Sequence, residues 1–280
     1  MSLVISTRNR APQLEQALES YARLEYEGPW EMVIVDNGSA DATPEVLAAF
    51  GQRFPGNLRL LRDGRPGLGG ARNVGWREAR GEIVAFTDDD CYPRPDYLVQ
   101  IRRCLADARF GFVGGRVLLH DPLDYPITIQ LSEQRLELPP RSYIAPGQIH
   151  GANFAFRRQV LEAIGGFDAR LGAGTKYHSA EDTDALARAS ASGWWGLYDP
   201  APTVSHHHGR RAGKDIQRIR KAHGIGTGAY FIKCLANPHL RGQYLRRWPR
   251  ALMKAGLRRG LWQLLGAGRF LATERFSTKP

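Results

Sequence analysis

The stretch Ile83-Val84-Ala85-Phe86-Thr87-Asp88-Asp89-Asp90 decides the fold that this sequence predicts. Four apolar residues run without a polar break and lead through one threonine into three consecutive carboxylates. An unbroken apolar run is typical of a strand that is buried on both faces of a parallel sheet. Ligands bind beyond the carboxyl ends of such strands, so the acidic triplet stands where a site is expected.

Similar apolar runs alternate with helical spacing along most of the chain. The expected strands cover residues 3–5, 32–35, 58–61, 83–86, 111–118, 152–156 and 194–198. The expected helices cover residues 14–24, 43–50, 71–80, 96–106 and 181–191. This alternation predicts an α/β fold with a Rossmann-like mixed sheet, mostly parallel and flanked by helices.

Polar segments follow three of the expected strands. Ser6-Thr7-Arg8-Asn9-Arg10 follows the first, Asp36-Asn37-Gly38-Ser39 the second, and Asp88-Asp89-Asp90 the strand quoted above. Each one alone is explained as well by a turn or a helix cap. Three at one edge of the sheet favour a binding site. The carboxylates suit Mg²⁺ or Mn²⁺, with a solvated acidic loop as the alternative.

Composition and termini exclude several classes of protein. The 280 residues are 42% hydrophobic and 24% charged, which is an ordinary globular balance. Three cysteines cannot pair completely, so a reducing, cytoplasmic setting is expected. The first ten residues hold only a three-residue apolar run, and no window reaches the roughly 20 apolar residues of a membrane span. Neither secretion nor a spanning segment is predicted.

Positive charge is concentrated after residue 208. Residues 1–208 carry a net charge of −4, and residues 209–280 carry +15 from 17 basic and two acidic residues. Apolar and basic residues alternate there with helical spacing, and Pro249 is expected to divide the segment into two helices. Such helices either lie on an anionic membrane or pack on the preceding domain. An RNA-binding role is an alternative, but the acidic triplet disfavours it and no nucleic acid is expected.

Five segments, taken in order, resemble the motifs of family 2 glycosyltransferases. They are Ser6-Thr7-Arg8-Asn9, Val35-Asp36-Asn37-Gly38-Ser39 with Asp41, Gly70-Ala71-Arg72-Asn73, Gly81 to Asp90, and Ala180-Glu181-Asp182. The likeness covers about residues 2–208 and implies the A-type glycosyltransferase (GT-A) fold, with a nucleotide-sugar half at 1–90, an acceptor half at 91–208 and a basic helical extension at 209–280. It also implies a metal-dependent transfer that inverts the anomeric carbon.

The resemblance assigns roles to single residues. It places Ser6, Thr7, Arg8, Asn9, Asp36, Asn37, Arg72, Asn73, Asp88 and Asp89 around a nucleotide-diphosphate sugar. Asp88 and Asp90 are the expected metal ligands, with Mn²⁺ or Mg²⁺ as the ion and His208 placed ahead of His206 as a further ligand. Asn37 departs from the Asp of many members, which leaves the base open, although a UDP-sugar is favoured.

The acceptor side follows from the same resemblance. Asp182 is the expected catalytic base, and Glu181 and Asn153 are expected to bind a glycan or lipid-linked acceptor. Acidic residues in a first helical turn also stabilise the helix dipole without any catalytic role. A sugar-phosphate nucleotidyltransferase is the enzymatic alternative, because Arg8 and Arg10 follow the first strand. The predicted location is cytoplasmic and peripheral on the inner face of the cell membrane, in cell-envelope or exopolysaccharide synthesis.

Overall fold

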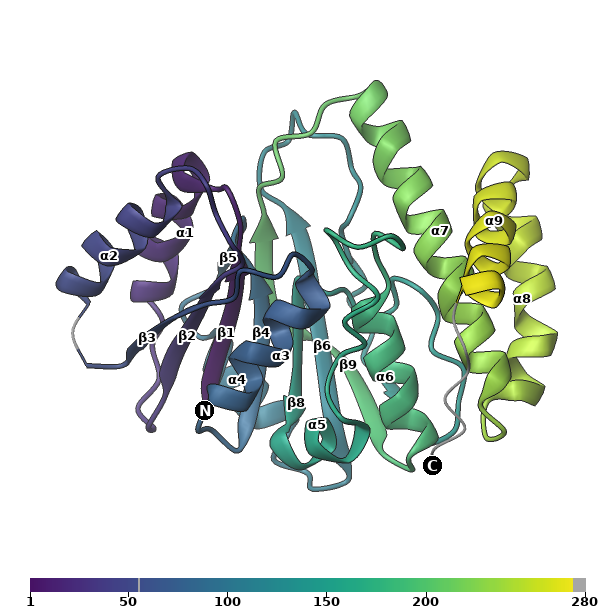
Figure 1. Cartoon of the computed structure of the whole chain (residues 1–280). Coiled ribbons are helices and arrows are strands. Elements are labelled where there is room, and N and C mark those ends of the chain that lie inside the picture. Colours follow the sequence, from purple (N-terminus) through teal and green to yellow (C-terminus); the bar gives the residue numbers. More distant parts are fainter. Residues whose placement is uncertain (55, 274–280) are drawn as a thin grey trace.

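The computed structural model describes residues 1–54 and 56–273 (Figure 1). Its strands are β1 (Ser2–Thr7), β2 (Glu31–Asp36), β3 (Leu58–Arg62), β4 (Ile83–Asp88), β5 (Cys91–Pro93), β6 (Phe110–Leu119), β7 (Leu136–Leu138), β8 (Asn153–Arg157) and β9 (Trp195–His206). Its helices are α1 (Ala11–Ala22), α2 (Thr43–Arg53), α3 (Leu68–Glu78), α4 (Tyr97–Cys104), α5 (Arg158–Ile164), α6 (Glu181–Ala191), α7 (Lys214–Ala236), α8 (Arg241–Ala255) and α9 (Leu257–Thr273). The strands and helices expected up to residue 198 are confirmed, with β9 longer than predicted.

The strands form one mixed sheet in the order β3-β2-β1-β4-β8-β6-β9-β5, with β7 paired to β9. Six of these nine strands point the same way, since β5, β7 and β8 run antiparallel to their partners. The register sets Ser6 of β1 beside Asp88 of β4, and Thr7 beside Asp36 of β2. The polar segments therefore do meet at one edge of the sheet, as the apolar runs predicted.

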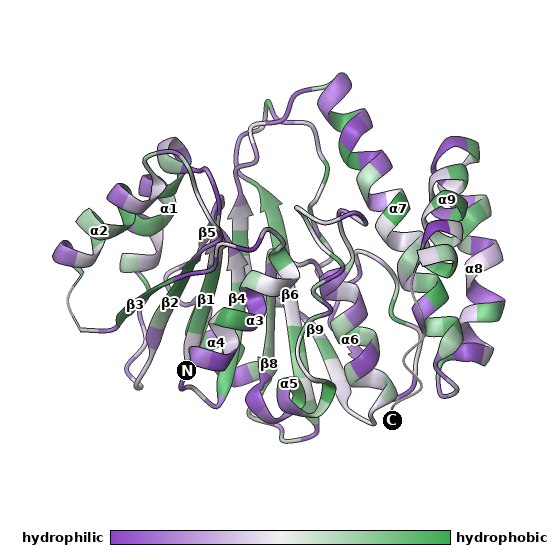
Figure 2. Cartoon of the chain, viewed as in Figure 1, coloured by the Kyte–Doolittle hydropathy of each residue, from purple (hydrophilic) through white to green (hydrophobic). Residues whose placement is uncertain are grey.

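Both faces of the sheet are covered, which explains the unbroken apolar runs. Leu3 and Ile5 of β1 pack in a core with α1, α2 and α4, whereas Val4 between them packs in a second core with α3, α5 and α6. Adjacent residues of a strand point to opposite faces, so each run must be apolar throughout. Figure 2 shows the hydrophobic residues gathered in β1, β2 and β4.

Helices α7, α8 and α9 lie on the opposite side of the molecule from β3 in Figure 1, and α7 packs on α6. Tyr230 and Phe231 of α7 and Tyr244 of α8 are fully buried in the same core as Phe154 of β8. The basic extension therefore shares its hydrophobic core with the sheet. Among the described residues, no helix combines the length and the apolar character that crossing a membrane requires.

The expected division at Pro249 is wrong. Helix α8 continues through Pro249 and ends at Ala255, and the next residue, Gly256, has φ of +76°. Pro249 is exposed, and so is Leu245 one turn earlier, whose carbonyl loses its helical partner and can be hydrated instead. The left-handed φ at Gly256 is favoured by glycine, so the chain turns there into α9.

Candidate active site

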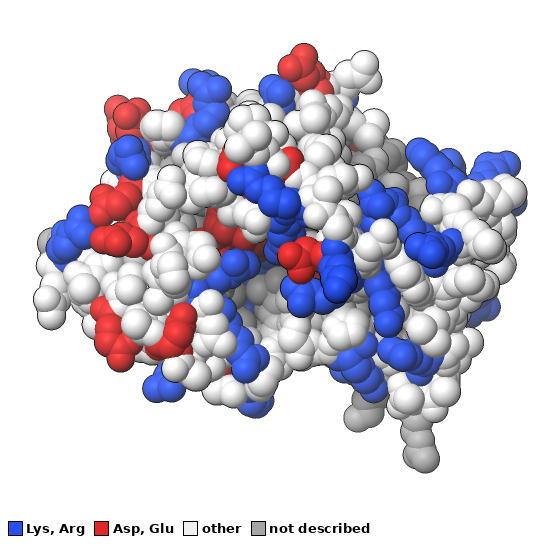
Figure 3. Space-filling model, turned by 90° about the horizontal axis from the view of Figure 1, so that it is seen from above, with Lys and Arg blue, Asp and Glu red and all other residues white. Residues whose placement is uncertain are grey.

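A cavity of about 1110 Å³ opens beyond the carboxyl ends of β1 and β4. It is lined from these strands, from the start of α6 and from α7, α8 and α9. Seen from above in Figure 3, acidic side chains lie inside the hollow and basic side chains crowd the part of its rim that belongs to α7–α9. The lining includes nine of the predicted site residues: Ser6, Thr7, Arg8, Asn37, Asp88, Asp89, Asp90, Glu181 and Asp182.

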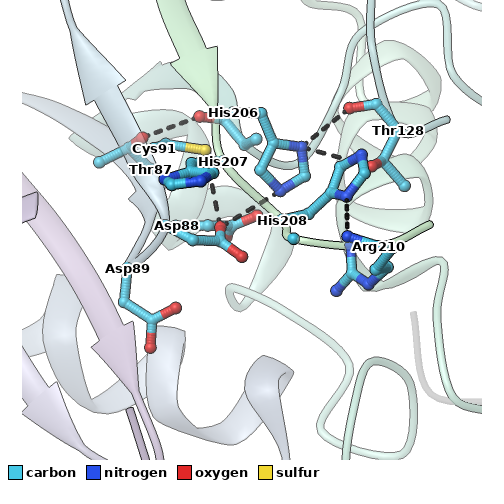
Figure 4. A network of polar contacts seen from close by, with 12 residues as sticks. Thr87, Asp88, Asp89, Cys91, Thr128, His206, His207, His208 and Arg210 are labelled. Carbon is cyan, nitrogen blue, oxygen red and sulfur yellow. Dashed lines mark hydrogen bonds and ion pairs between the residues drawn. The ribbon is translucent and has the colours of Figure 1, made fainter. Parts of the chain in front are cut away.

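The three carboxylates Asp88, Asp89 and Asp90 contact different partners. Asp90 lies 3.2 Å from Nε2 of His206 and 3.3 Å from Nη2 of Arg10. Burial would raise the pKa of Asp90, but the hydrogen bond and charge of His206 hold it below its usual range. Asp89 points away from the histidines in Figure 4, and burial beside Asp90 raises its pKa.

His206 is arranged as metal-binding histidines are. Its Nδ1 lies 3.0 Å from the carbonyl oxygen of Thr128, and its Nε2 faces Asp90. A histidine that donates from one ring nitrogen to a carbonyl presents the other to a metal. Ligand atoms of Asp90, Cys91 and His206 lie within 4.8 Å of one another. Burial raises the pKa of the Cys91 thiol, which keeps it protonated and a poor ligand for a hard cation.

His208 lies beside His206, with the two ring centroids 5.2 Å apart, but it has other partners (Figure 4). Its Nδ1 accepts a hydrogen bond from the backbone N–H of Arg210 at 3.0 Å and lies 3.5 Å from Asp124. Its Nε2 is buried without a hydrogen-bond partner among the described residues. The geometry therefore moves our assignment of the histidine ligand from His208 to His206.

Arg72 joins two acidic residues that are far apart in the sequence. Its guanidinium contacts Asp88 at 3.0 Å, Glu181 at 2.7 Å and the carbonyl oxygen of Gly151 at 2.8 Å. The ring of Phe154 lies 5.2 Å from the guanidinium carbon. Arg72 is buried and does not line the cavity, so it fixes the carboxylates relative to each other instead of contacting the nucleotide as expected.

Asp182 lines the cavity, and its two carboxylate oxygens have different surroundings. Its Oδ1 accepts hydrogen bonds from the backbone N–H of Thr183 at 2.7 Å and from the Thr183 hydroxyl at 3.2 Å. Its Oδ2 has no hydrogen-bond partner among the described residues. The side chain is half-buried at the start of α6, next to Glu181, and Asp182 raises the pKa of Glu181 together with burial. One oxygen is thus held while the other is free to accept a proton.

The end of β1 carries unsatisfied polar atoms. The hydroxyls of Ser6 and Thr7 are buried without a hydrogen-bond partner among the described residues. Oδ2 of Asp36 also lacks a hydrogen bond there and has only an ion-pair contact of 3.8 Å with Arg62. Asn37 is fully occupied instead, because it donates to the carbonyls of Asp63 and Arg65 and accepts from the backbone N–H of Gly67. Buried polar atoms are normally paired, so these orphan groups suggest a polar ligand.

Three other predicted residues hold the fold and do not line the cavity. Asn73 donates to the carbonyl of Phe167 and accepts from its N–H, at 2.7 and 2.8 Å. Asn153 donates to the carbonyls of Arg116 and Pro202, which joins β6 to β9. Asn9 has φ of +54° and accepts from the N–H of Ala40. The structure does not bring Asn153 to the acceptor side, so we withdraw it from the proposed site.

The sequence did not single out Arg10 and His150, or a set of basic residues, as lining residues. Arg10 contacts Asp89 and Asp90, and in the sequence it stood out only as part of the polar segment after the first strand. His150 also lines the cavity, and burial lowers its pKa to about 3, so it is a neutral imidazole. The basic set comes from the extension: Arg210, Arg220, Arg247, Arg250, Lys254 and Arg259. Its signals were the positive charge and the helical spacing of a segment remote from the motifs.

Known structures share this architecture. The chain superposes on the mannosyltransferase PcManGT of Pyrobaculum calidifontis, in complex with GDP-Man and Mn²⁺, with a TM-score of 0.64 and 22% identity, over 98% of this chain and 80% of that one. It superposes on residues 1–349 of TarS from S. aureus, in complex with UDP-GlcNAc, with a TM-score of 0.65 and 17% identity. This superposition covers 96% of this chain and 80% of the TarS chain. Both likenesses support the GT-A fold.

Sequence comparisons also find glycosyltransferases. EpsH of Bacillus subtilis, a putative glycosyltransferase, is 27% identical over 58% of this chain and 48% of its own length. The N-acetylglucosaminyl-diphospho-decaprenol L-rhamnosyltransferase of Mycobacterium tuberculosis is 26% identical over 81% of this chain and 82% of its own length. The chain spans about half the length of several such relatives. The model of glycosyl transferase family 2 matches residues 2–165, more than half of the sequence, and the chain therefore belongs to this family.

Proposed function

We propose that this chain transfers a sugar from a nucleotide-diphosphate donor to a hydroxyl of a glycan or lipid-linked acceptor, with inversion at the anomeric carbon. The observation that carries the proposal is that Asp182, with one free carboxylate oxygen, lines the same cavity as Asp88 and Asp90. An inverting transfer needs a proton acceptor on one side of the sugar and stabilisation of the leaving diphosphate on the other.

Asp88, Asp90 and His206 are the residues that we expect to hold a divalent cation. Two buried or half-buried carboxylates repel each other, and the short approach of His206 Nε2 to Asp90 requires a proton or a cation between them. Oxygen and imidazole donors suit Mn²⁺ or Mg²⁺. A bound cation supplies Lewis-acid stabilisation of the charge that develops on the leaving diphosphate.

The donor base and ribose fit the end of β1. The orphan hydroxyls of Ser6 and Thr7 and the exposed Arg8 line the cavity there, next to Asn37. We expect a UDP-sugar first. PcManGT was captured with GDP-Man and TarS with UDP-GlcNAc, so both bases belong in any screen.

Asp182 acts as the general base in this proposal. Its Oδ2 takes the proton of the acceptor hydroxyl while that oxygen forms a bond to the anomeric carbon, and the bond to the nucleoside diphosphate breaks. General base catalysis of this kind contributes about 10² to 10⁴ in rate. Glu181, tied to Arg72, orients the acceptor beside it.

Binding and turnover test the proposal separately. A thermal-shift screen of UDP and GDP with and without Mn²⁺ should show stabilisation that needs the metal, since a ligand of the native state raises apparent stability. Asp90→Ala should remove the metal-dependent shift. Asp182→Asn should keep it and lose transfer by 10² or more, whereas the exposed control Asp215→Asn should keep both. Turnover that survives in Asp182→Asn would contradict the base assignment.

We also propose that the extension docks on an anionic membrane at the cytoplasmic face. Large exposed apolar residues gather on α8 and α9: Leu245, Met253, Leu257, Leu261, Leu264, Leu265 and Leu271. Leu257, Leu261 and Leu264 share one face of α9 by their spacing. Basic residues interleave with them, as in helices that lie in a lipid interface.

A point-variant test suits this surface better than truncation, because Tyr244 of the extension belongs to the core. Leu257→Ser/Leu261→Ser should reduce co-flotation with phosphatidylglycerol vesicles at least fivefold. The control is Leu123→Ser, which removes a leucine that is 75% exposed outside these helices. Equal flotation of both variants would refute the membrane proposal. The nucleotidyltransferase alternative keeps only Arg8 as a phosphate-binding residue after the first strand, since Arg10 is committed to Asp89 and Asp90.

A further inference from the structure

One side of the cavity is built from six basic side chains of α7, α8, α9 and the loop before them. We call this set the basic wall: Arg210, Arg220, Arg247, Arg250, Lys254 and Arg259. The proposed metal site and Asp182 lie in the same cavity but come from other elements. A ligand that reaches the basic wall can therefore also reach Asp182.

The described part of the segment that carries the basic wall has little acidic charge of its own. Among the described residues from 209 onward, Asp215 is the only acidic one, and it pairs with Arg218. Other basic residues of the extension do find acids in the sheet domain, as Lys233 does with Asp184 at 2.8 Å. No member of the basic wall has such an ion pair within the described part of the chain. Arg210 also acts on the nearby Asp90, whose pKa its charge helps to lower. The other five cations have no ion pair in this part of the chain, so they repel each other and favour an anion.

Aromatic contacts hold part of the basic wall in place before any ligand arrives. Arg220 donates to the hydroxyl of Tyr125 at 2.6 Å, and its Nε is buried with no hydrogen-bond partner in the described part of the chain. Arg247 lies over the ring of Tyr143 at 5.6 Å. Arg247, Arg250 and Lys254 follow at spacings of three and four, so they share one face of α8. Guanidinium groups fixed in this way match the bidentate geometry of phosphate.

The basic wall adjoins the acceptor side of the cavity. The loop that leads into α6 and Asp182 is bonded to α7, with Ser179 Oγ donating to the carbonyl of Ala222 at 3.2 Å. The proposed donor groups Ser6 and Thr7 come from the end of β1, on another element. Building on the proposed function, we propose that the basic wall binds a phosphate or diphosphate group carried by the acceptor, while the acceptor hydroxyl reaches Asp182.

Inorganic pyrophosphate is the probe, titrated calorimetrically in EDTA so that metal-dependent binding at the carboxylates is silent. The full chain should bind it, and Arg247→Gln/Arg250→Gln should weaken binding tenfold or more. The matched control is Arg246→Gln/Arg258→Gln, which removes the same charge from exposed residues of α8 and α9 outside the cavity. The control should change the affinity by less than twofold. All four arginines are exposed, so both variants should fold.

Two further ligands identify the source of the phosphate. A ten-carbon prenyl diphosphate that binds more tightly than pyrophosphate indicates a lipid-linked acceptor, and equal affinities indicate a water-soluble phosphorylated one. A single-stranded RNA that binds more tightly than either, and is lost in the same variant, would overturn the proposal. Equal losses in the two double variants would also overturn it.

Donor binding is measured in parallel, so that the two proposals can fail separately. The Mn²⁺-dependent nucleotide shift should persist in Arg247→Gln/Arg250→Gln. Suppose that this variant keeps the nucleotide shift and also binds pyrophosphate as tightly as the unmodified chain. The basic wall proposal is then wrong, and the glycosyltransferase proposal stands. If the unmodified chain binds no nucleotide diphosphate under any condition, the glycosyltransferase proposal fails instead.

Discussion

Gly151 lies against the carboxylate of Asp182, so closely that a Cβ on the glycine would stand 2.6 Å from Asp182 Oδ2. The atom in the way is the end of a side chain that can rotate, so the backbone need not move. Gly151→Ala should therefore fold normally and displace the proposed base. Misplacing a reacting group by about 1 Å can cost ~10² in rate.

We expect kcat of Gly151→Ala to fall 10- to 100-fold with a melting temperature close to that of the parent protein. Gly242→Ala is the control, since no atom lies within 4 Å of its added Cβ. A Gly151→Ala enzyme with full kcat would show that the position of Asp182 Oδ2 does not govern the reaction.

Arg72 gives a second prediction, about stability. Arg72→Met leaves the Asp88 and Glu181 carboxylates and the carbonyl of Gly151 without their shared partner. Breaking a buried ion pair by removing one member costs about 3–5 kcal/mol. Urea unfolding should show a loss of this size. Adding Glu181→Gln to Arg72→Met should recover part of it, because a neutral amide is cheaper to bury than an unpaired carboxylate. A loss below about 1 kcal/mol would contradict the role of Arg72.

The half-buried cation Lys233 gives a pH-dependent prediction. Lys233 bonds Asp168 and lies 2.8 Å from Asp184, with Arg170 also on Asp168. Burial opposes ionisation of Asp168, but the hydrogen bonds of Arg170 and the charge of Lys233 outweigh it and hold its pKa well below the usual range. A depressed pKa stabilises the fold above the unfolded value near 4, and this stabilisation is lost as the pH falls through the folded pKa.

The stability penalty of Lys233→Met should therefore be larger at pH 6 than at pH 3. At pH 6 we expect about 3 kcal/mol, as for a broken buried pair. At pH 3 the variant, whose Asp168 has lost the pKa-lowering effect of Lys233, can take up a proton there, so the penalty should shrink. Unfolding by urea at the two pH values measures both, with the exposed Lys221→Met as a control for loss of a positive charge. An equal penalty at both values would count against the electrostatic origin.

Sequence patterns could predict the sheet because its strands are buried on both faces. The run Ile83 to Phe86 has no polar interruption, and the acids at its end follow from the position of a site in parallel sheets. The partners of these acids could not be predicted. Arg72 and Asn73 are adjacent in the sequence, yet one binds carboxylates and the other binds the carbonyl of Phe167. Such differences depend on which loop packs against α3, and no local pattern encodes it.

The same limit explains the histidines and the extension. His206 and His208 share one face of an extended segment, so periodicity cannot separate them, whereas β5 pairs Cys91 with His206 and brings Asp90 to that ring. The basic residues of α8 were visible as a charged helix face. That this face lines the cavity depends on how α7 and α9 pack, which is set by close contacts between glycines and backbone.

Helices α7 and α9 approach so closely that a Cβ on Gly228 would stand 1.9 Å from the carbonyl oxygen of Gln263. The obstacle is backbone, so Gly228→Ala must push α9 away from α7. We expect a loss of about 1–3 kcal/mol, typical of overpacking, and weaker pyrophosphate binding because the basic wall spans both helices. Gly268→Ala on α9 meets nothing within 4 Å and should be neutral or stabilising by up to about 1 kcal/mol, since alanine favours a helix. Urea unfolding and calorimetry of the two variants provide the comparison. Equal stability of both would mean that the packing of α7 on α9 tolerates a Cβ, and that the glycines do not set the position of the basic wall.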